Sequence, residues 1–179
     1  MPKNSVMQIQ KDEKKILEEL SKNAHSSINE IANKLGFSRQ KVWRIIKNLE
    51  NDKTIWGYTA IIDDNKIGVK RFCILLKKAP VKVTDKKLNI VINRDLLKTA
   101  MKNKVTLEST YFFYGEYDGQ ICVTAENIQQ VKNFINDMQN KIGSDYFKEI
   151  KIMQVLVPIQ IRGFPNPNIT QLKEYFPID

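Results

Sequence analysis

A short stretch near the N-terminus, residues 38–49, combines side chains that suit DNA binding. Ser38 suits a helix N-cap, because its hydroxyl can accept hydrogen bonds from free amides of the first turn. Behind it, apolar residues recur at i, i+3, i+4 and i+7, which makes one face of a helix. Four cations on so short a helix repel one another unless water or phosphates neutralise them. The apolar residues are Val42, Ile45, Ile46 and Leu49, and the cations are Arg39, Lys41, Arg44 and Lys47. The stretch is interpreted as a DNA recognition helix.

Two polar side chains of this helix have the chemistry to read bases. Glutamine pairs bidentately with adenine and arginine with guanine in the major groove. Gln40 and Arg44 are therefore predicted to contact base edges. Trp43, on the flank of the polar face, can contact a thymine methyl or a sugar, or pack against a neighbouring helix. Packing is predicted, because large aromatic side chains mostly lie in cores and interfaces. Phosphate contacts, which fix register without reading sequence, are predicted for Ser38, Arg39, Lys41 and Lys47.

A first supporting helix is predicted from Asp12 to about Asn23. Its apolar residues recur at helical spacing. Asp12 and Glu13 are predicted at its start, where carboxylates interact favourably with the helix dipole. His25, the only histidine, falls in the loop that follows. With no second histidine and no cysteine nearby, it is not predicted to bind a metal or to catalyse.

A second supporting helix follows Ser27, which forms a capping-box pattern with Glu30. Gly36 is predicted to end it, because glycine adopts the left-handed conformation without steric cost. Helix, tight glycine turn and helix make a helix-turn-helix motif. Three short amphipathic helices can also pack as a protein-binding bundle whose charges form a solvated face, so that alternative stays open.

The composition of the whole chain is basic. The 179 residues include 29 lysines and arginines and 20 acidic residues, for a net charge of +9. The part up to Ile62 and the remainder are both positive, so total charge does not locate the DNA surface.

Cys73 and Cys122 lie in apolar strand-like runs and are predicted to be buried reduced thiols, with a disulfide as the alternative. No apolar run reaches membrane-spanning length and no leader is visible, so a cytoplasmic location is predicted.

The second part of the chain is predicted to be a β-α-β-β-α-β domain, the ferredoxin-like arrangement. A β-branched and aromatic segment, residues 54–62, is predicted to be extended and to link the two parts. The predicted domains are 1–62 and 63–179. Alternating apolar residues at 88, 90 and 92 favour a short edge strand or an extended loop. The expected elements are strand 71–78, helix 94–103 capped by Asn93, strand 105–114, a hairpin through 115–119 to strand 120–124, helix 127–142 ended by Gly143, and strand 151–161.

Blocks of residues across both parts match a known pattern. They are Asp12 to Leu17, Ile31-Ala32, Leu35-Gly36, Ser38, Val42, Arg44-Ile45, Leu49-Glu50 and, most specifically, Gly57 to Asp63. In this order they resemble the Lrp/AsnC (leucine-responsive, feast/famine) family of transcriptional regulators. The resemblance implies an α+β protein with a winged-type helix-turn-helix domain and then a ferredoxin-like domain for ligand sensing and dimerisation. Residues 80–93 are longer than the family's connection between first strand and first helix, and residues 162–179 extend past its last strand.

The resemblance also implies partners. These are double-stranded DNA and a second copy of the chain, in a homodimer or a higher oligomer. The segment Gly115 to Asp118 matches the family's glycine-any-any-aspartate turn, where small effectors such as amino acids bind between dimers. Gly115, Tyr117 and Asp118 are therefore expected to contact an effector. The C-terminal tail is expected to dock on a surface through Leu172, Tyr175 and Phe176.

Three functions follow from these patterns. The first is a sequence-specific regulator that binds a pseudo-palindromic site as a dimer. The second is an architectural DNA-binding protein of low specificity. The third is an enzyme, because a branch resembling this family decarboxylates a haem precursor. Such chemistry needs histidine and arginine, but the second domain has no histidine and its arginines are Arg71, Arg94 and Arg162. No catalytic residue, metal ligand or cofactor is predicted.

Overall fold

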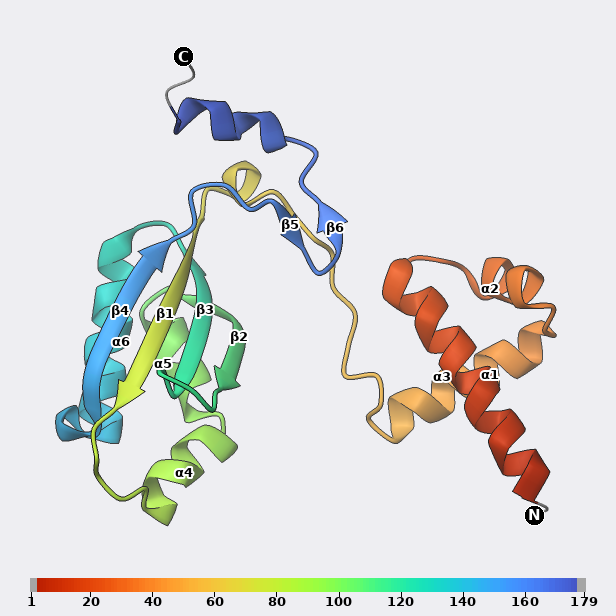
Figure 1. The fold of residues 1–179 in the computed structure, drawn as a ribbon, viewed down its shortest axis with the longest axis horizontal. Coiled ribbons are helices and arrows are strands. Elements are labelled where there is room, and N and C mark those ends of the chain that lie inside the picture. Colours follow the sequence, from red (N-terminus) through yellow and green to blue (C-terminus); the bar gives the residue numbers. More distant parts are fainter. Residues whose placement is uncertain (1–2, 177–179) are drawn as a thin grey trace. The chain divides into compact units, whose positions relative to one another are not determined.

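The structure, a computed structural model, describes residues 3–176 (Figure 1). The chain forms two compact units, Met1–Ile61 and Ile62–Asp179. Each unit has its own apolar core, so each is described by itself.

The first unit contains three helices, α1 (Lys3–Lys22), α2 (Ile28–Leu35) and α3 (Arg39–Asn51). One apolar residue of α1, Ile16, packs with the inner faces of α2 and α3. The buried members of this core are Ile16, Ile31, Ala32, Val42, Ile45 and Leu49. Because these side chains come from three helices, their burial fixes which face of α3 points outward.

The predicted start of the first helix is wrong. α1 begins at Lys3, so Asp12 and Glu13 lie in its middle. Residues 3–11 contain neither glycine nor proline, and nothing in them stops a helix from extending toward the N-terminus. Gln8 also donates a hydrogen bond to the Asp12 carboxylate one turn later, at 2.9 Å.

The predicted ends of the other two helices are confirmed. The Ser27 hydroxyl accepts from the Glu30 N–H, and the Glu30 carboxylate accepts from the Ser27 N–H, at 3.2 and 2.6 Å. Gly36 ends α2 in the left-handed conformation, with φ of 66°. The Ser38 hydroxyl caps α3 by accepting from the Lys41 N–H at 3.2 Å. The turn between α2 and α3 is therefore fixed by local hydrogen bonds.

The segment 54–62, predicted to be extended and to link the two parts, pairs with no other strand in the single chain. The segment belongs to no helix or strand, and Trp56 is almost fully exposed. Its β-branched and aromatic composition favours a strand only where another strand is available for pairing.

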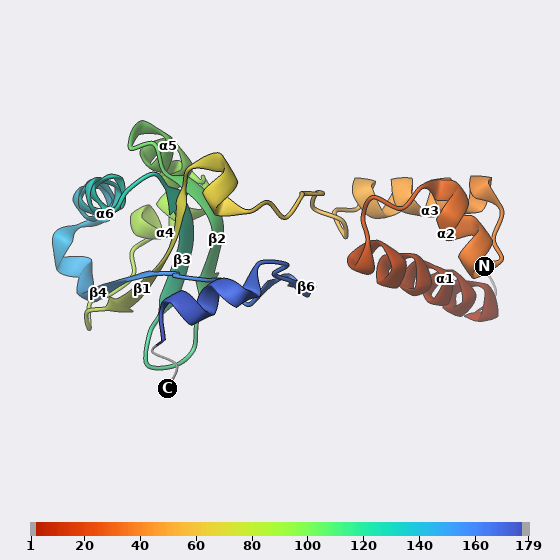
Figure 2. The same ribbon diagram turned by 90° about the horizontal axis from the view of Figure 1, so that it is seen from above.

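The second unit has a four-stranded antiparallel sheet with strand order β2-β3-β1-β4. Its main elements are β1 (Lys70–Lys78), α4 (Asp85–Ile92), α5 (Asp95–Lys102), β2 (Thr106–Phe112), β3 (Gly119–Ala125), α6 (Ile128–Ile142) and β4 (Phe147–Gln154). The helices α4, α5 and α6 cover one face of this sheet (Figure 2). Alternate strand residues, among them Phe72, Ile74 and Val123, point into that layer and are buried with Phe134. This is the predicted ferredoxin-like arrangement, with the first helix split into α4 and α5.

Three predicted details of this unit are wrong. Residues 85–92 form the helix α4 instead of a strand or loop, because Thr84 caps them and an alternation of two also fits the i, i+4 spacing of a helix. Asn93 ends α4 and does not cap α5, which begins after Arg94 in a left-handed conformation with φ of 56°. The last strand, β4, covers 147–154 rather than 151–161.

The tail after β4 contains short elements. They are the strands β5 (Gln160–Ile161) and β6 (Phe164–Pro165) and the 3-10 helix η3 (Ile169–Glu174), while two more 3-10 helices, η1 (Asp64–Ile67) and η2 (Ser144–Tyr146), precede β1 and β4. Leu172 is half-buried as expected, but Tyr175 and Phe176 are exposed, so they do not dock within this unit. The last residues of the predicted tail, 177–179, lie outside the described part of the chain.

Candidate nucleic-acid interface

The outer face of α3 presents its polar side chains to solvent. Arg39, Gln40, Arg44 and Lys47 are exposed. Within residues 3–176, the side chains of Arg39, Gln40 and Arg44 have no hydrogen-bond or ion-pair partner. The inner face is buried in the three-helix core. The predicted separation of an apolar and a basic face is therefore present, and the side chains proposed to read bases are not engaged by the protein itself.

Lys41 differs from the other cations of α3. Its Nζ atom lies 2.6 Å from the Asp12 carboxylate and 4.0 Å from the centre of the Phe37 ring. Asp12 is buried, at 3% exposure. A buried carboxylate depends on its cation, because an uncompensated charge away from water is costly. Lys41 thus joins α3 to α1, and the structure does not leave it free for a phosphate.

We expect the Asp12–Lys41 pair to make unfolding depend on pH. The Lys41 ammonium first, with Gln8, holds the pKa of Asp12 below its usual range, against the opposing effect of burial. A depressed folded-state pKa contributes stability above the unfolded-state pKa, about 3.9, and this is lost as pH falls through the folded value. Asp12→Asn should therefore lower the free energy of unfolding at pH 7 by about 1–3 kcal/mol and by less at pH 3. Urea unfolding at both pH values tests this, with the exposed Glu13→Gln as control; equal losses at both pH values would contradict it.

Lys47 is held only at the surface. Its Nζ atom pairs with the Glu50 carboxylate at 2.7 Å, and the other Glu50 oxygen accepts from the Tyr58 hydroxyl at 3.1 Å. Exposed pairs of this kind contribute little free energy, so Lys47 can exchange Glu50 for another anion. Trp43 is 52% exposed next to Arg44 and does not pack in the core of this unit. Its position falls between the buried and the polar stripes of α3, so an interface or a DNA contact stays open.

The predicted effector residues do not converge on one site. The Asp118 carboxylate accepts from the Lys78 N–H at 2.6 Å and lines a cavity on the helical side of the sheet. Tyr117 lies instead beside Lys77 and Lys151, whose Nζ atoms are 5.7 and 5.3 Å from the ring centre. Gly115 is exposed and lines no part of that cavity. Of the three, only Asp118 faces an enclosed space.

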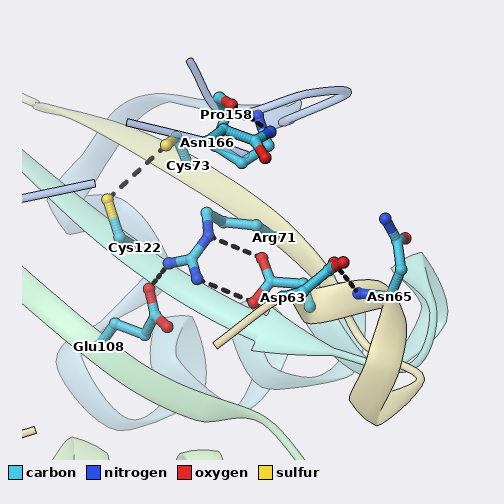
Figure 3. Close-up of polar contacts among 9 residues, drawn as sticks. Asp63, Asn65, Arg71, Cys73, Glu108, Cys122, Pro158 and Asn166 are labelled. Atoms are coloured by element: carbon cyan, nitrogen blue, oxygen red, sulfur yellow. Dashed lines mark hydrogen bonds and ion pairs between the residues drawn. The ribbon is translucent and has the colours of Figure 1, made fainter. Parts of the chain in front are cut away.

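The sheet face opposite the helices carries a polar cluster (Figure 3). The Arg71 guanidinium pairs with both oxygens of Asp64 at 2.9 Å and with Glu108. The neighbouring Cys73 is a free thiol, with its sulfur 3.7 Å from that of Cys122. Burial is the main cause that raises the pKa of Cys73, so its thiol stays protonated at neutral pH and reacts slowly. These side chains are engaged with one another, and no group of three or more His, Cys, Asp or Glu in the described ranges is arranged to hold a metal.

Sequence reasoning missed two features of the site. The partnership of Asp12 with Lys41 joins residues of different helices, and its only local signal is a carboxylate at a position that faces the core. The contact of Asp118 with the Lys78 backbone joins a hairpin to a neighbouring strand, and no local spacing reveals it.

No helix within residues 3–176 combines the length and apolar character that crossing a membrane requires.

Comparisons with known proteins agree with this architecture. Residues 13–55 match the family model described as winged helix-turn-helix DNA-binding. The regulator LrpC of Bacillus subtilis is 28% identical over 121 residues, which cover 68% of this chain and 77% of LrpC. The regulator LrpA of Pyrococcus horikoshii is 45% identical over 60 residues, 34% of this chain and 43% of LrpA.

A solved structure extends the likeness to the whole fold. The feast or famine regulatory protein of M. tuberculosis, complexed with L-methionine, superposes with a TM-score of 0.63 at 15% identity, over 83% of this chain and 92% of that protein. The helix-turn-helix match, the relatives named as regulators and the shared two-unit fold agree with the residue pattern that the sequence carries. The chain therefore carries a helix-turn-helix DNA-binding domain and is similar, over most of its length, to transcriptional regulators of the Lrp/AsnC type.

Proposed function

We propose that the protein is a sequence-specific transcriptional regulator that binds operator DNA through α3. The observation that carries this proposal is the outer face of α3, where Arg39, Gln40 and Arg44 are exposed and unpaired within the described structure while the inner face is buried. A helix whose apolar face is buried in the core, and whose polar side chains are exposed without partners, can enter the major groove without rearrangement.

The residues of this face divide into two roles. Gln40 and Arg44 are proposed to contact base edges, since their side chains can pair bidentately with adenine and guanine. Ser38, Arg39 and Lys47 are proposed to hold phosphates at the start and along the flank of the helix. Lys41, also predicted to hold a phosphate, is proposed instead to fix α3 on α1 through Asp12, because its ammonium is already paired there.

The protein is proposed to act as a homodimer in the cytoplasm. Two copies of α3 related by a two-fold axis can enter successive major grooves about 34 Å apart, which requires a pseudo-palindromic operator. The second unit, residues 63–179, is proposed to supply the dimer contact and any further assembly. Its sheet has one face free of helices, and the tail adds further apolar side chains that are exposed in the single chain.

A small effector is proposed to modulate the regulator. The structural relative from M. tuberculosis is complexed with L-methionine, and the present chain carries the same kind of second unit. The turn at Gly115 to Asp118 is proposed to take part, although its three predicted contacts point in different directions. We assign no reaction to the protein, since the Cys73 thiol reacts slowly and its neighbour Arg71 is bound by two carboxylates.

Binding of DNA across a salt series tests this function. We expect the full chain to bind a fragment of its own upstream region at least about 10³-fold more tightly than random DNA at physiological salt. Footprinting should show two protected half-sites one helical turn apart. Equal affinity for all fragments, with a steep salt dependence, would replace the proposal with the architectural protein that the basic composition also allows. Absence of binding at every salt concentration would overturn both.

A further inference from the structure

A cavity of about 310 Å³ lies within the second unit, between the sheet and its helices. One wall is α4, which belongs to the segment 80–93 that is longer than the family's usual connection. Its lining is mainly apolar and includes Leu76, Val83, Leu88, Val91, Ile121 and Met138. A volume near 300 Å³ lies at the lower end of the range for sites that bind small molecules, so the space suits a small metabolite.

The cavity lining includes a cation, Lys87, on α4. The Lys87 side chain is only 20% exposed, and its nearest carboxylate, Asp145, is 3.9 Å away and itself 73% exposed. Its Nζ atom also lies 4.7 Å from the centre of the Tyr146 ring. Within residues 3–176 this ammonium donates no hydrogen bond. A largely covered cation with one distant, solvated partner is well placed to hold an anion.

The other charged groups of the lining favour an anion over a zwitterion. Lys78 contributes a second cation. The lining has one carboxylate, Asp118, and part of its acceptor capacity is used by the Lys78 N–H at 2.6 Å, so the two cations outweigh it. A ligand with an apolar body against the aliphatic and aromatic side chains of the lining and an anionic end at Lys87 would satisfy both parts of the cavity.

We infer that this cavity binds a small aliphatic monocarboxylate, with its chain between α4 and the sheet and its carboxylate on the Lys87 ammonium. As a regulatory site, it rests on the proposed function. As a binding site, it stands on the cavity and on Lys87 alone. Because α4 forms one wall, the additional segment 80–93 then supplies the Lys87 ammonium of a ligand site that shares only Asp118 with the turn at Gly115 to Asp118.

The test measures binding to the full chain in the absence of DNA, by calorimetry. Three probes share six carbons: hexanoate, hexylamine and L-norleucine. Hexanoate should bind, and Lys87→Met should weaken it at least about tenfold, as expected for the loss of one charge-assisted hydrogen bond. Lys87→Arg should retain binding. The control Lys86→Met removes an exposed lysine from the same helix and should change nothing.

A second variant tests the cavity itself. Val91→Trp fills it from α4 and should abolish hexanoate binding, while circular dichroism confirms that the variant is folded. Hexanoate affinity that survives Val91→Trp or Lys87→Met overturns the site. Hexylamine or norleucine binding as tightly as hexanoate overturns the carboxylate class, and no saturable binding at millimolar hexanoate overturns the inference altogether. DNA affinity with and without hexanoate is then measured separately, so failure of the regulator and failure of the site are distinguishable.

Discussion

Replacing Gln40 and Arg44 together with alanine is expected to remove the preference of the protein for its operator while leaving its binding to random DNA. Both side chains are exposed on α3, and a good bidentate base contact discriminates against the wrong base by about 1–3 kcal/mol. Two such contacts in each protomer of a dimer therefore account for a loss of several orders of magnitude in operator affinity. Binding to random DNA depends on phosphates, and the proposed phosphate contacts of Arg39 and Lys47 are left in place.

The measurement is a titration of labelled operator and random fragments at fixed salt. The control is Gln129→Ala/Lys132→Ala, which removes the same amide and one positive charge from exposed positions of α6. It should preserve the preference. If the Gln40→Ala/Arg44→Ala protein keeps its discrimination, or loses both kinds of binding equally, then α3 does not read bases in the proposed way.

Phe134→Ala is expected to destabilise the second unit by about 3–5 kcal/mol, the usual cost of removing a fully buried phenylalanine. Phe134 lies on α6 with no exposed surface, among the sheet residues Phe72, Ile74 and Val123. Its removal loses apolar burial and leaves a void that the sheet, held by pairing on both sides of β1, can only partly close.

Urea unfolding followed by circular dichroism measures this loss as a lower transition midpoint at unchanged slope. Ile128→Ala is the matched control, because Ile128 lies on the same helix but is 39% exposed. It should cost less than about 1 kcal/mol. Equal destabilisation by the two substitutions would mean that the core of this unit is not centred on α6.

Local signals in the sequence were enough for the helix-turn-helix. Ser27 with Glu30, Gly36 and Ser38 each act within one helical turn, and each was predicted from its own neighbourhood. The alternation of buried residues along β1 and β3, and the cap of α6 at Asn127, are local in the same way. Hence the fold class follows from short-range chemistry.

The errors arise where distant residues decide the outcome. Residues 54–62 have strand composition, but strand formation needs a partner. For residues 85–92 the competing signals were a two-residue alternation and the cap at Thr84, and the cap prevailed. In the candidate site, the exposure of Gln40 and Arg44 followed from helix periodicity. The capture of Lys41 by Asp12 did not, because it depends on how α1 packs on α3.

The pairing of Lys41 with Asp12 has a consequence for the search along a chromosome. Attraction to DNA of any sequence grows with the number of phosphates neutralised, and each contributes about 0.9 to the slope of log K against log salt concentration. Withdrawing one cation from each protomer lowers that slope by about 2 for a dimer. The proposed contacts of Gln40 and Arg44 with base edges would be unchanged, because neither residue is involved in the pair. By pairing with Lys41, the buried Asp12 carboxylate would therefore shorten the time that the protein spends on non-operator DNA. It favours discrimination between sequences over total affinity for DNA.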